Sequence, residues 1–360
     1  MPPSSIRHCL LLALFACTIL PATAATPSTA EPAEPTQLVL DNGSVRLEAT
    51  TAFGGRILSW HLHGEPNVLK VGQDAVRAQP RPDWSATAGD IPYLGHDVWV
   101  GPQSEWWIHQ DANLARRQSR ANWPPDPYLS LAPTRLLSHD ARQFSLEGVD
   151  SPVSGVRLRK QVRLASDADN TVLLDAEARN IRDTDIAWDL WFNTRVAAST
   201  RVFVPVAAAS DIELAASTDA GTISPRHDFA DGLFVLTARQ ADSADIQRGK
   251  YRLQPAAGWM AGFAGHQLFV IRFDHQPRER IHREQGQVEL YLDAPSRTPA
   301  AGLLEMEVHA PYHTLAPGQG MLAAERWTLL RYDGPDEAAA QRDFLCRQAT
   351  RLALQHACAH

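Results

Sequence analysis

The chain has 360 residues, of which 44% are hydrophobic and 21% charged. This composition is that of a folded protein and excludes a disordered or fibrous polypeptide. Acidic residues outnumber basic ones, 41 to 34, and the net charge is −7. A protein that binds a phosphate backbone needs a basic excess, so nucleic acid is not an expected partner.

The N-terminal residues have the pattern of an export signal. Arg7 precedes the apolar run 9–20, and Ala22 and Ala24 fit the small-residue pattern of a signal-peptidase site. The run is shorter than the ~20 residues that span a bilayer. We therefore expect a signal peptide over residues 1–24, a periplasmic or secreted protein, and no transmembrane anchor after cleavage. A lipid anchor at Cys17 is the alternative.

From residue 37 onward the sequence alternates between short apolar strands and turns. Residues 37–40 and 44–50 flank the turn Asp41-Asn42-Gly43 and predict a hairpin. Further strands are expected over residues 55–63, 143–149, 156–164, 171–180, 186–196, 268–273, 288–293, 303–309 and 325–332. Because helices do not alternate with these strands, the pattern favours an all-β antiparallel sandwich.

The domain organisation follows from the same pattern. Residues 25–36 are rich in Pro, Thr, Ala and Glu and predict a disordered linker. We expect one β-domain over residues 37–333 and a helical tail over residues 334–360. A disulfide between Cys346 and Cys358 would require the helix of this tail to end before His356, because a helix keeps the two residues too far apart. Free thiols are the alternative.

Half of the tryptophans lie between residues 84 and 123, in a segment that is also rich in proline. They are Trp84, Trp99, Trp106, Trp107 and Trp123. A loop of this length is usually functional or disordered, and its aromatic content argues against disorder. We interpret the segment as a rigid loop that contributes to a site.

Several stretches are informative together: Phe53-Gly54-Gly55 with residues 56–63, and residues 95–103, 123–127, 305–307, 315–318 and 325–327. In their order and spacing they resemble the galactose mutarotase-like superfamily, most closely a branch known only as a domain of unknown function. The resemblance covers about residues 37–333. It implies a single large antiparallel supersandwich whose concave face binds a sugar. In the enzymes of the superfamily a glutamate base and a histidine acid interconvert anomers, but their further histidine motifs have no clear counterpart here.

Strand alternation assigns the side chains of residues 186–196 to two faces. The apolar face belongs in the core, whereas Asp189, Trp191, Asn193 and Arg195 share the other face. An indole beside planar polar groups suits the C–H face and the hydroxyls of a sugar ring. We predict that Asp189, Trp191 and Asn193 bind a ligand. A solvated outer face is the alternative.

Residues 303–309 alternate in the same way. Glu305, Glu307 and His309 share the face opposite the apolar residues. Neighbouring carboxyl groups push each other's pKa values apart and can divide the roles of acid and base. A wet outer surface is again the alternative.

The first functional hypothesis is an exported protein that binds a sugar or an oligosaccharide. Whether it is an enzyme stays open, and epimerisation at an anomeric carbon is the reaction that the resemblance implies. The catalytic candidates are His96, Glu307, His309 and Glu325. The ligand-binding candidates are Arg56, Trp99, Gln103, Trp123, Asp189, Trp191, Asn193 and Glu305. Arg56 has an alternative role, which is to pair with an acidic neighbour.

No cofactor and no metal ion are expected. His61 and His63 share a strand face, but no cluster of further ligands accompanies them in the sequence. A second hypothesis is a non-catalytic envelope protein whose tryptophan-rich loops dock a protein partner, because clustered Trp and Arg also characterise interfaces. A third is a glycoside hydrolase, which needs two carboxyl groups on either side of a cleft.

Overall fold

The computed structural model describes residues 36–166, 170–237, 245–295 and 302–357. The expected signal peptide, nearly all of the expected linker, and both Cys17 and Cys358 lie outside these residues. In the described part of the chain, none of the helices has the length and apolar character needed to cross a membrane.

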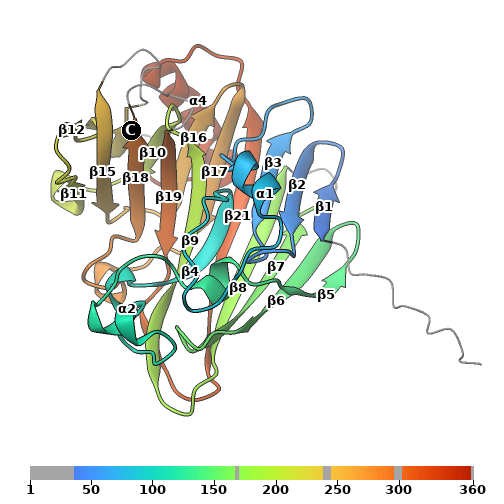
Figure 1. Ribbon diagram of the computed structural model, residues 1–360. Coiled ribbons are helices and arrows are strands. Elements are labelled where there is room, and N and C mark those ends of the chain that lie inside the picture. Colours follow the sequence, from blue (N-terminus) through green and yellow to red (C-terminus); the bar gives the residue numbers. More distant parts are fainter. Residues whose placement is uncertain (1–35, 167–169, 238–244, 296–301, 358–360) are drawn as a thin grey trace, which may run out of the picture. The chain divides into compact units, whose positions relative to one another are not determined.

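Two large sheets form the body of residues 36–357 (Figure 1). The first sheet runs in the order β1 (Gln37–Asp41), β2 (Val45–Thr50), β3 (Ile57–Leu62), β4 (His96–Gly101), β9 (Ile186–Ala197), β19 (Leu303–His309), β18 (Val288–Ala294), β15 (Ile246–Leu253) and β11 (Ile212–Ala216). Two short strands complete it, β12 (Thr222–Ile223) beside β15 and β20 (His313–Leu315) beside β9.

The second sheet packs against the first. Its order is β13 (His227–Ala230), β14 (Leu233–Leu236), β10 (Arg201–Pro205), β16 (Trp259–Ala264), β17 (Gln267–Phe273), β21 (Gly320–Arg331), β8 (Thr171–Asn180), β7 (Val156–Leu164), β6 (Gln143–Asp150) and β5 (Arg135–His139). The described strand pairs are antiparallel, apart from β12 with β15. The predicted all-β antiparallel sandwich is therefore confirmed.

The main core lies between the two sheets. It joins Trp60 and Phe192 of the first sheet to Phe269 and Trp327 of the second. The Trp60 ring centroid lies 4.9 Å from that of Trp327 and 6.0 Å from that of Phe269. Burial of such large aromatic side chains is the main source of stability in a sandwich of this kind.

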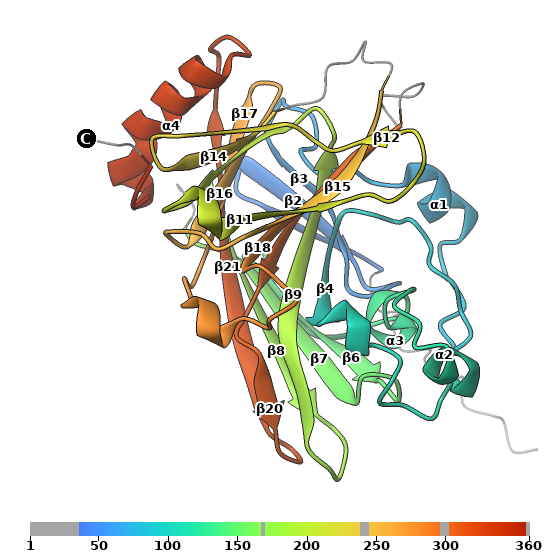
Figure 2. The same cartoon turned by 90° about the vertical axis from the view of Figure 1, so that its left-hand side faces the viewer.

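Long connections with short helices cover the other face of the first sheet (Figure 2). One connects β3 to β4 and contains α1 (Gln73–Ala78). The next connects β4 to β5 and contains the 3₁₀ helix η1 (Gln103–Glu105), α2 (Leu114–Gln118) and α3 (Pro127–Ser130). Two more 3₁₀ helices lie further along the chain, η2 (Ala209–Asp211) and η3 (Arg278–Arg280).

The helix α4 (Ala338–Leu352) packs on the outer face of the second sheet. Leu345 and Leu352 contact a second apolar cluster that includes Trp259 and Tyr332. The helix ends at Leu352, before His356, so the condition for a disulfide in this tail is met. Cys346 is disulfide-bonded, and Cys358, its expected partner, lies outside the described residues.

The strand β4 is a departure from the sequence interpretation, which treated residues 84–123 as a loop. All six residues of β4 are buried, because the core covers one face and the long connections cover the other. Both faces are therefore closed to solvent, and the strand shows none of the apolar–polar alternation by which a half-buried strand is recognised.

Candidate functional site

A cavity of about 440 Å³ lies on the face of the first sheet that the long connections cover. Trp191 and Arg195 of β9 and Glu305 and Glu307 of β19 contribute to its floor. The remaining lining comes from neighbouring strands and from the two connections: Arg56, Asp90, Ile91, Pro92, Leu94, Trp99, Gln103, Trp123, Pro125, Lys250, Tyr291 and Leu303. Its volume falls in the range of small-molecule sites.

Strand register explains why polar side chains converge here. Residues paired across neighbouring strands point to the same face of a sheet. One row across β9, β19, β18 and β15 consists of Arg195, Glu305, Tyr291 and Lys250. The next row consists of Asn193, Glu307, Glu289 and Arg252. Charges of opposite sign therefore lie side by side over four strands.

The indoles of the cavity differ in how open they are. Trp191 is only 3% exposed. Its ring stacks on Trp106 with the centroids 5.5 Å apart, and the Lys250 ammonium lies 5.0 Å from its centroid. Trp99 is covered by the Arg195 guanidinium at 4.7 Å. Trp123, in contrast, is 49% exposed, so it offers the open ring surface that the sequence interpretation assigned to Trp191.

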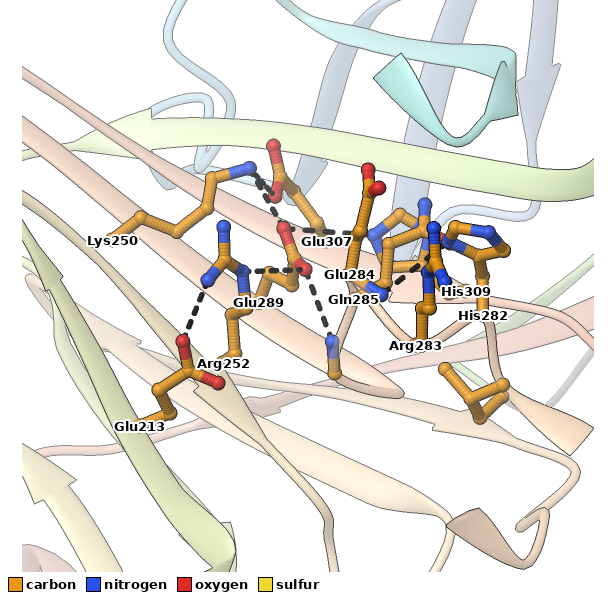
Figure 3. A network of polar contacts seen from close by, with 12 residues as sticks. Glu213, Lys250, Arg252, His282, Arg283, Glu284, Gln285, Glu289, Glu307 and His309 are labelled. Atoms are coloured by element: carbon orange, nitrogen blue, oxygen red, sulfur yellow. Dashed lines mark hydrogen bonds and ion pairs between the residues drawn. The ribbon is translucent and has the colours of Figure 1, made fainter. Parts of the chain in front are cut away.

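A network of buried charges lies beneath and beside the floor (Figure 3). The Lys250 Nζ atom is 2.7 Å from Glu307 Oε2 and 2.8 Å from Glu289 Oε2. His309 Nδ1 is 2.8 Å from Gln285 Nε2 and 3.4 Å from Asp189 Oδ1. Apart from Lys250, which is partly exposed, these groups are almost fully enclosed, so their charges must balance one another.

The protonation states of this network follow from that balance. Burial opposes the charge of His309, but the Asp189 and Glu289 carboxylates outweigh it and raise its pKa to about 9. Burial also opposes the charge of Glu289, yet Lys250 and His309 lower its pKa. Burial raises the pKa of Glu307 to about 8, and Lys250 offsets only part of this effect. When Glu307 carries a proton, the cations Lys250 and His309 balance the carboxylates of Asp189 and Glu289, and the cluster is neutral.

Glu305 and Glu307 are close neighbours with different environments. The Asn193 Nδ2 atom lies 3.2 Å from Glu305 Oε1 and 3.3 Å from Glu307 Oε1. Glu305 also pairs with Arg195, whose Nε atom is 2.9 Å from the same oxygen. One carboxyl group in an ion pair beside another that holds a proton is an arrangement suited to acid–base chemistry.

Arg56 pairs with an acidic neighbour, which is one of the two roles that the sequence left open, and its role in ligand binding stays a prediction. Its Nη2 atom lies 2.6 Å from Asp97 Oδ2, and Nη1 donates to the Leu94 carbonyl at 2.8 Å. Its Nε atom has no hydrogen-bond partner among the described residues, and the side chain lines the cavity. Gly54 turns the chain before it with φ of +61°, and a Cβ there would lie 2.6 Å from the Ser130 carbonyl oxygen.

The structure brings most of the predicted residues together at the cavity. Those that line it are Arg56, Trp99, Gln103, Trp123, Trp191, Glu305 and Glu307. A second group shares the same face of the sheet but lies fully buried under or beside the floor: Asp189, Asn193 and His309. Their roles as ligand contacts or catalytic groups stay predictions, and their present contacts are with the side chains of the floor.

The structure does not bring His96 and Glu325 to the cavity. Both lie between the sheets. The strand β4 directs His96 toward the core and directs Asp97 and Trp99 the other way, and Glu325 lies on the same face of β21 as the buried Trp327. His96 Nδ1 is 3.0 Å from Thr194 Oγ1, and burial keeps its pKa well below the usual value. Glu325 accepts a hydrogen bond from Trp327 Nε1 at 2.8 Å, and burial raises its pKa to about 8. A proton exchange with a ligand in the cavity is out of reach from these positions.

Sequence reasoning missed three polar residues of the lining, Asp90, Lys250 and Tyr291. Tyr291 lies on the expected strand 288–293, whereas Lys250 lies on β15, which the sequence analysis did not predict. The place of both residues beside Glu305 depends on the register of three strands. Asp90 comes from the irregular connection before β4, where no periodicity identifies it.

Glu289, Glu307 and His309 also come close enough to share an ion, with ligand atoms within 4.8 Å of one another. The Lys250 ammonium contacts two of them, however, and supplies a positive charge at the point where an ion would be held. We therefore interpret this cluster as an internal ion-pair network.

Comparison with solved structures confirms the mutarotase-like fold. An Escherichia coli K12 protein described as a candidate aldose 1-epimerase has a TM-score of 0.51 and 11% identity, covering 82% of this chain and 99% of that one. A galactose mutarotase-like protein of Lactobacillus casei has a TM-score of 0.51 and 9% identity, covering 82% and 100%. A Synechocystis protein has a TM-score of 0.51 and 11% identity, covering 85% and 99%. At such identities the likeness shows the fold alone.

Sequence comparison leads to the family. A search among curated proteins finds no match. Residues 36–330 match the family model described as a domain of unknown function, DUF4380. This match includes the whole lining of the cavity and both sheets, apart from the last residue of β21, and the chain therefore belongs to the DUF4380 family.

Proposed function

We propose that the cavity on the first sheet binds a sugar ring. The observation that carries this proposal is the half-exposed indole of Trp123 beside a floor of charged and hydrogen-bonding groups. A sugar presents a C–H face to an aromatic ring and hydroxyl groups to planar polar side chains. The mutarotase-like fold supports the same proposal.

Unpartnered donors in the lining fit this ligand. Arg56 Nε, Arg195 Nη1 and Trp191 Nε1 are buried and have no hydrogen-bond partner among the described residues. Buried donors without partners are costly, and a small shift of these side chains toward the cavity would bring them within reach of a sugar hydroxyl, which is an acceptor.

Calorimetric titration with a panel of monosaccharides and disaccharides tests sugar binding. Trp123→Ala is expected to weaken binding about tenfold or more, which corresponds to about 1.4 kcal/mol. Its melting temperature should stay close to that of the wild type, because the side chain is half-exposed.

Leu322→Ala is the matched control, since Leu322 is exposed on β21 of the second sheet. It should bind sugars as the wild type does. Absence of binding across the whole panel would refute the proposal. Unchanged affinity in Trp123→Ala would show that the Trp123 indole does not contact the sugar.

The alternative of a protein-docking surface has less support. A docking patch needs several exposed aromatic side chains. Among the described tryptophans of residues 84–123, Trp99, Trp106 and Trp107 are buried, and Trp99 and Trp123 face a cavity. The concave arrangement favours a small ligand over a flat partner.

We further propose that the bound sugar exchanges anomers with Glu307 as the acid and Glu305 as the base. Opening of a cyclic hemiacetal needs a proton for the ring oxygen and removal of the proton from the anomeric hydroxyl. Glu307 holds a proton at neutral pH and Glu305 lies in an ion pair with Arg195. His309 acts on Glu307 only indirectly, because its positive charge helps to neutralise the buried carboxylates of Asp189 and Glu289 in the same cluster.

We also propose that the protein is exported, on the basis of the pattern in residues 1–24. The expected result is a mature protein that begins at residue 25, as N-terminal sequencing of material from the periplasm or medium would show. Full-length protein confined to the cytoplasm would contradict this.

A further inference from the structure

A second cavity, of about 210 Å³, adjoins the sugar cavity. The two cavities share three lining side chains, Gln103, Trp191 and Lys250. Gln103 donates from Nε2 to the Asn122 carbonyl at 2.8 Å, and Lys250 is held by its two ion pairs. Both cavities therefore border on the same three side chains, two of which are held in place by these contacts.

The second cavity has the chemistry of a sugar subsite. Ser104, Asn122 and Gln285 supply neutral hydrogen-bonding groups to its lining. Gln285 is 5% exposed; one end of its amide contacts His309 Nδ1, and the other end has no hydrogen-bond partner among the described residues. Arg252 Nε lacks one as well. A hydroxyl group both donates and accepts, so after a small shift of these side chains it can satisfy either end of the Gln285 amide and the unpartnered guanidinium N–H of Arg252.

The charges of this cavity favour a neutral ligand over an anion. Lys250 Nζ is 2.8 Å from Glu289 Oε2, and Arg252 Nε is 3.8 Å from Glu289 Oε1 (Figure 3). Ser104 Oγ donates to Glu284 Oε2 at 2.6 Å. Each cation in the lining already has a carboxylate partner, so an added negative charge would find no uncompensated cation.

We propose that the second cavity is a subsite for a further sugar unit, so that the ligand is an oligosaccharide of at least two units. This inference rests on the proposed sugar binding at the first cavity. One unit occupies the first cavity beside Trp123, the next occupies the second cavity beside Gln285, and the linkage between them lies along the side chains that border both cavities, Gln103, Trp191 and Lys250.

Ser104→Phe tests the proposal, because Ser104 lines only the second cavity and a phenyl ring there would fill it. Calorimetry would compare wild type and variant with monosaccharides and with the disaccharides built from them. For the wild type we expect the preferred disaccharide to bind about tenfold more tightly than its monosaccharide unit. In Ser104→Phe the disaccharide should lose this advantage, whereas the affinity for the monosaccharide should not change.

Ser138→Phe is the matched control, since Ser138 is exposed on β5 of the second sheet. Asn122→Ala is a milder second variant and should reduce only disaccharide affinity. If monosaccharide and disaccharide bind equally to the wild type, or Ser104→Phe weakens neither, the second subsite is refuted while sugar binding stands. If no sugar binds to any form of the protein, the proposed function itself fails.

Discussion

Glu307→Gln is expected to slow catalysed anomer exchange by about a hundredfold or more, the usual contribution of a positioned proton donor. Glutamine has nearly the size of a protonated glutamate and keeps a hydrogen-bonding group beside Asn193, so the fold should persist. Its amide cannot deliver a proton to a ring oxygen. Polarimetry of a freshly dissolved sugar, with and without protein, measures the effect.

The control for this variant is Glu337→Gln, an exposed residue before α4, which should exchange anomers at the wild-type rate. Calorimetry should show that Glu307→Gln still binds sugar. A variant that binds sugar and exchanges anomers at the full rate would refute the catalytic role of Glu307 and leave sugar binding in place.

The proton on the Glu307 carboxyl group makes the rate of anomer exchange depend on pH. Burial raises the pKa of Glu307 to about 8, so the acid is protonated below this pH and loses its proton above it. The catalysed rate should therefore fall as the pH rises through about 8. The charged groups that face Glu307 are Lys250 from β15, Glu289 from β18, and Glu305 and His309 from β19. A catalysed rate that is constant from neutral to clearly alkaline pH would contradict this assignment.

Asp97→Ala is expected to lower the free energy of unfolding by about 3–5 kcal/mol, the usual cost of removing one partner from a buried ion pair. Asp97 has no exposed surface. It pairs with Arg56 at 2.6 Å, accepts from Trp99 Nε1 at 2.9 Å, and lies 3.8 Å from Lys160 Nζ. Its removal leaves a buried guanidinium and a buried ammonium without their carboxylate. Urea unfolding, followed by tryptophan fluorescence, measures the loss.

Asp74→Ala provides the comparison for this measurement. Asp74 forms an ion pair with Arg77 on α1, but its side chain is almost fully exposed. Exposed pairs contribute little, so its unfolding free energy should stay within about 0.5 kcal/mol of the wild type. If Asp97→Ala were as stable as Asp74→Ala, the buried network around Arg56 would not be a stabilising element of the fold.

Much of the sandwich is readable from the sequence because its strands alternate. The observed bounds of β7, β8 and β19 coincide with the predicted ones. The same alternation placed Trp191 and Glu305 on one face, and the structure brings both to one cavity. A half-buried strand carries this information locally, in the period of its own side chains.

The remaining features depend on contacts that are distant in the sequence. The assignment of Trp191 as the open indole did not anticipate Trp106, which returns from the β4–β5 connection and stacks on it. Because β4 is buried on both faces, the sequence did not identify it as a strand, and the direction of the His96 side chain could not be predicted. Lys250 reaches Glu307 only through the pairing of β15 with β18 and of β18 with β19. Pairing partners of this kind are not encoded in any single segment.

The strand β9 carries core side chains on one face and Trp191, Asn193 and Arg195 on the other. A single alternation of side chains along the strand therefore sets both the packing of the core and the floor of the cavity. Deletion of a single residue within it would exchange the two faces from that point onward. Evolutionary insertions and deletions should therefore collect in the connections that cover the cavity, and relatives with different ligands should differ there while the length of β9 stays constant.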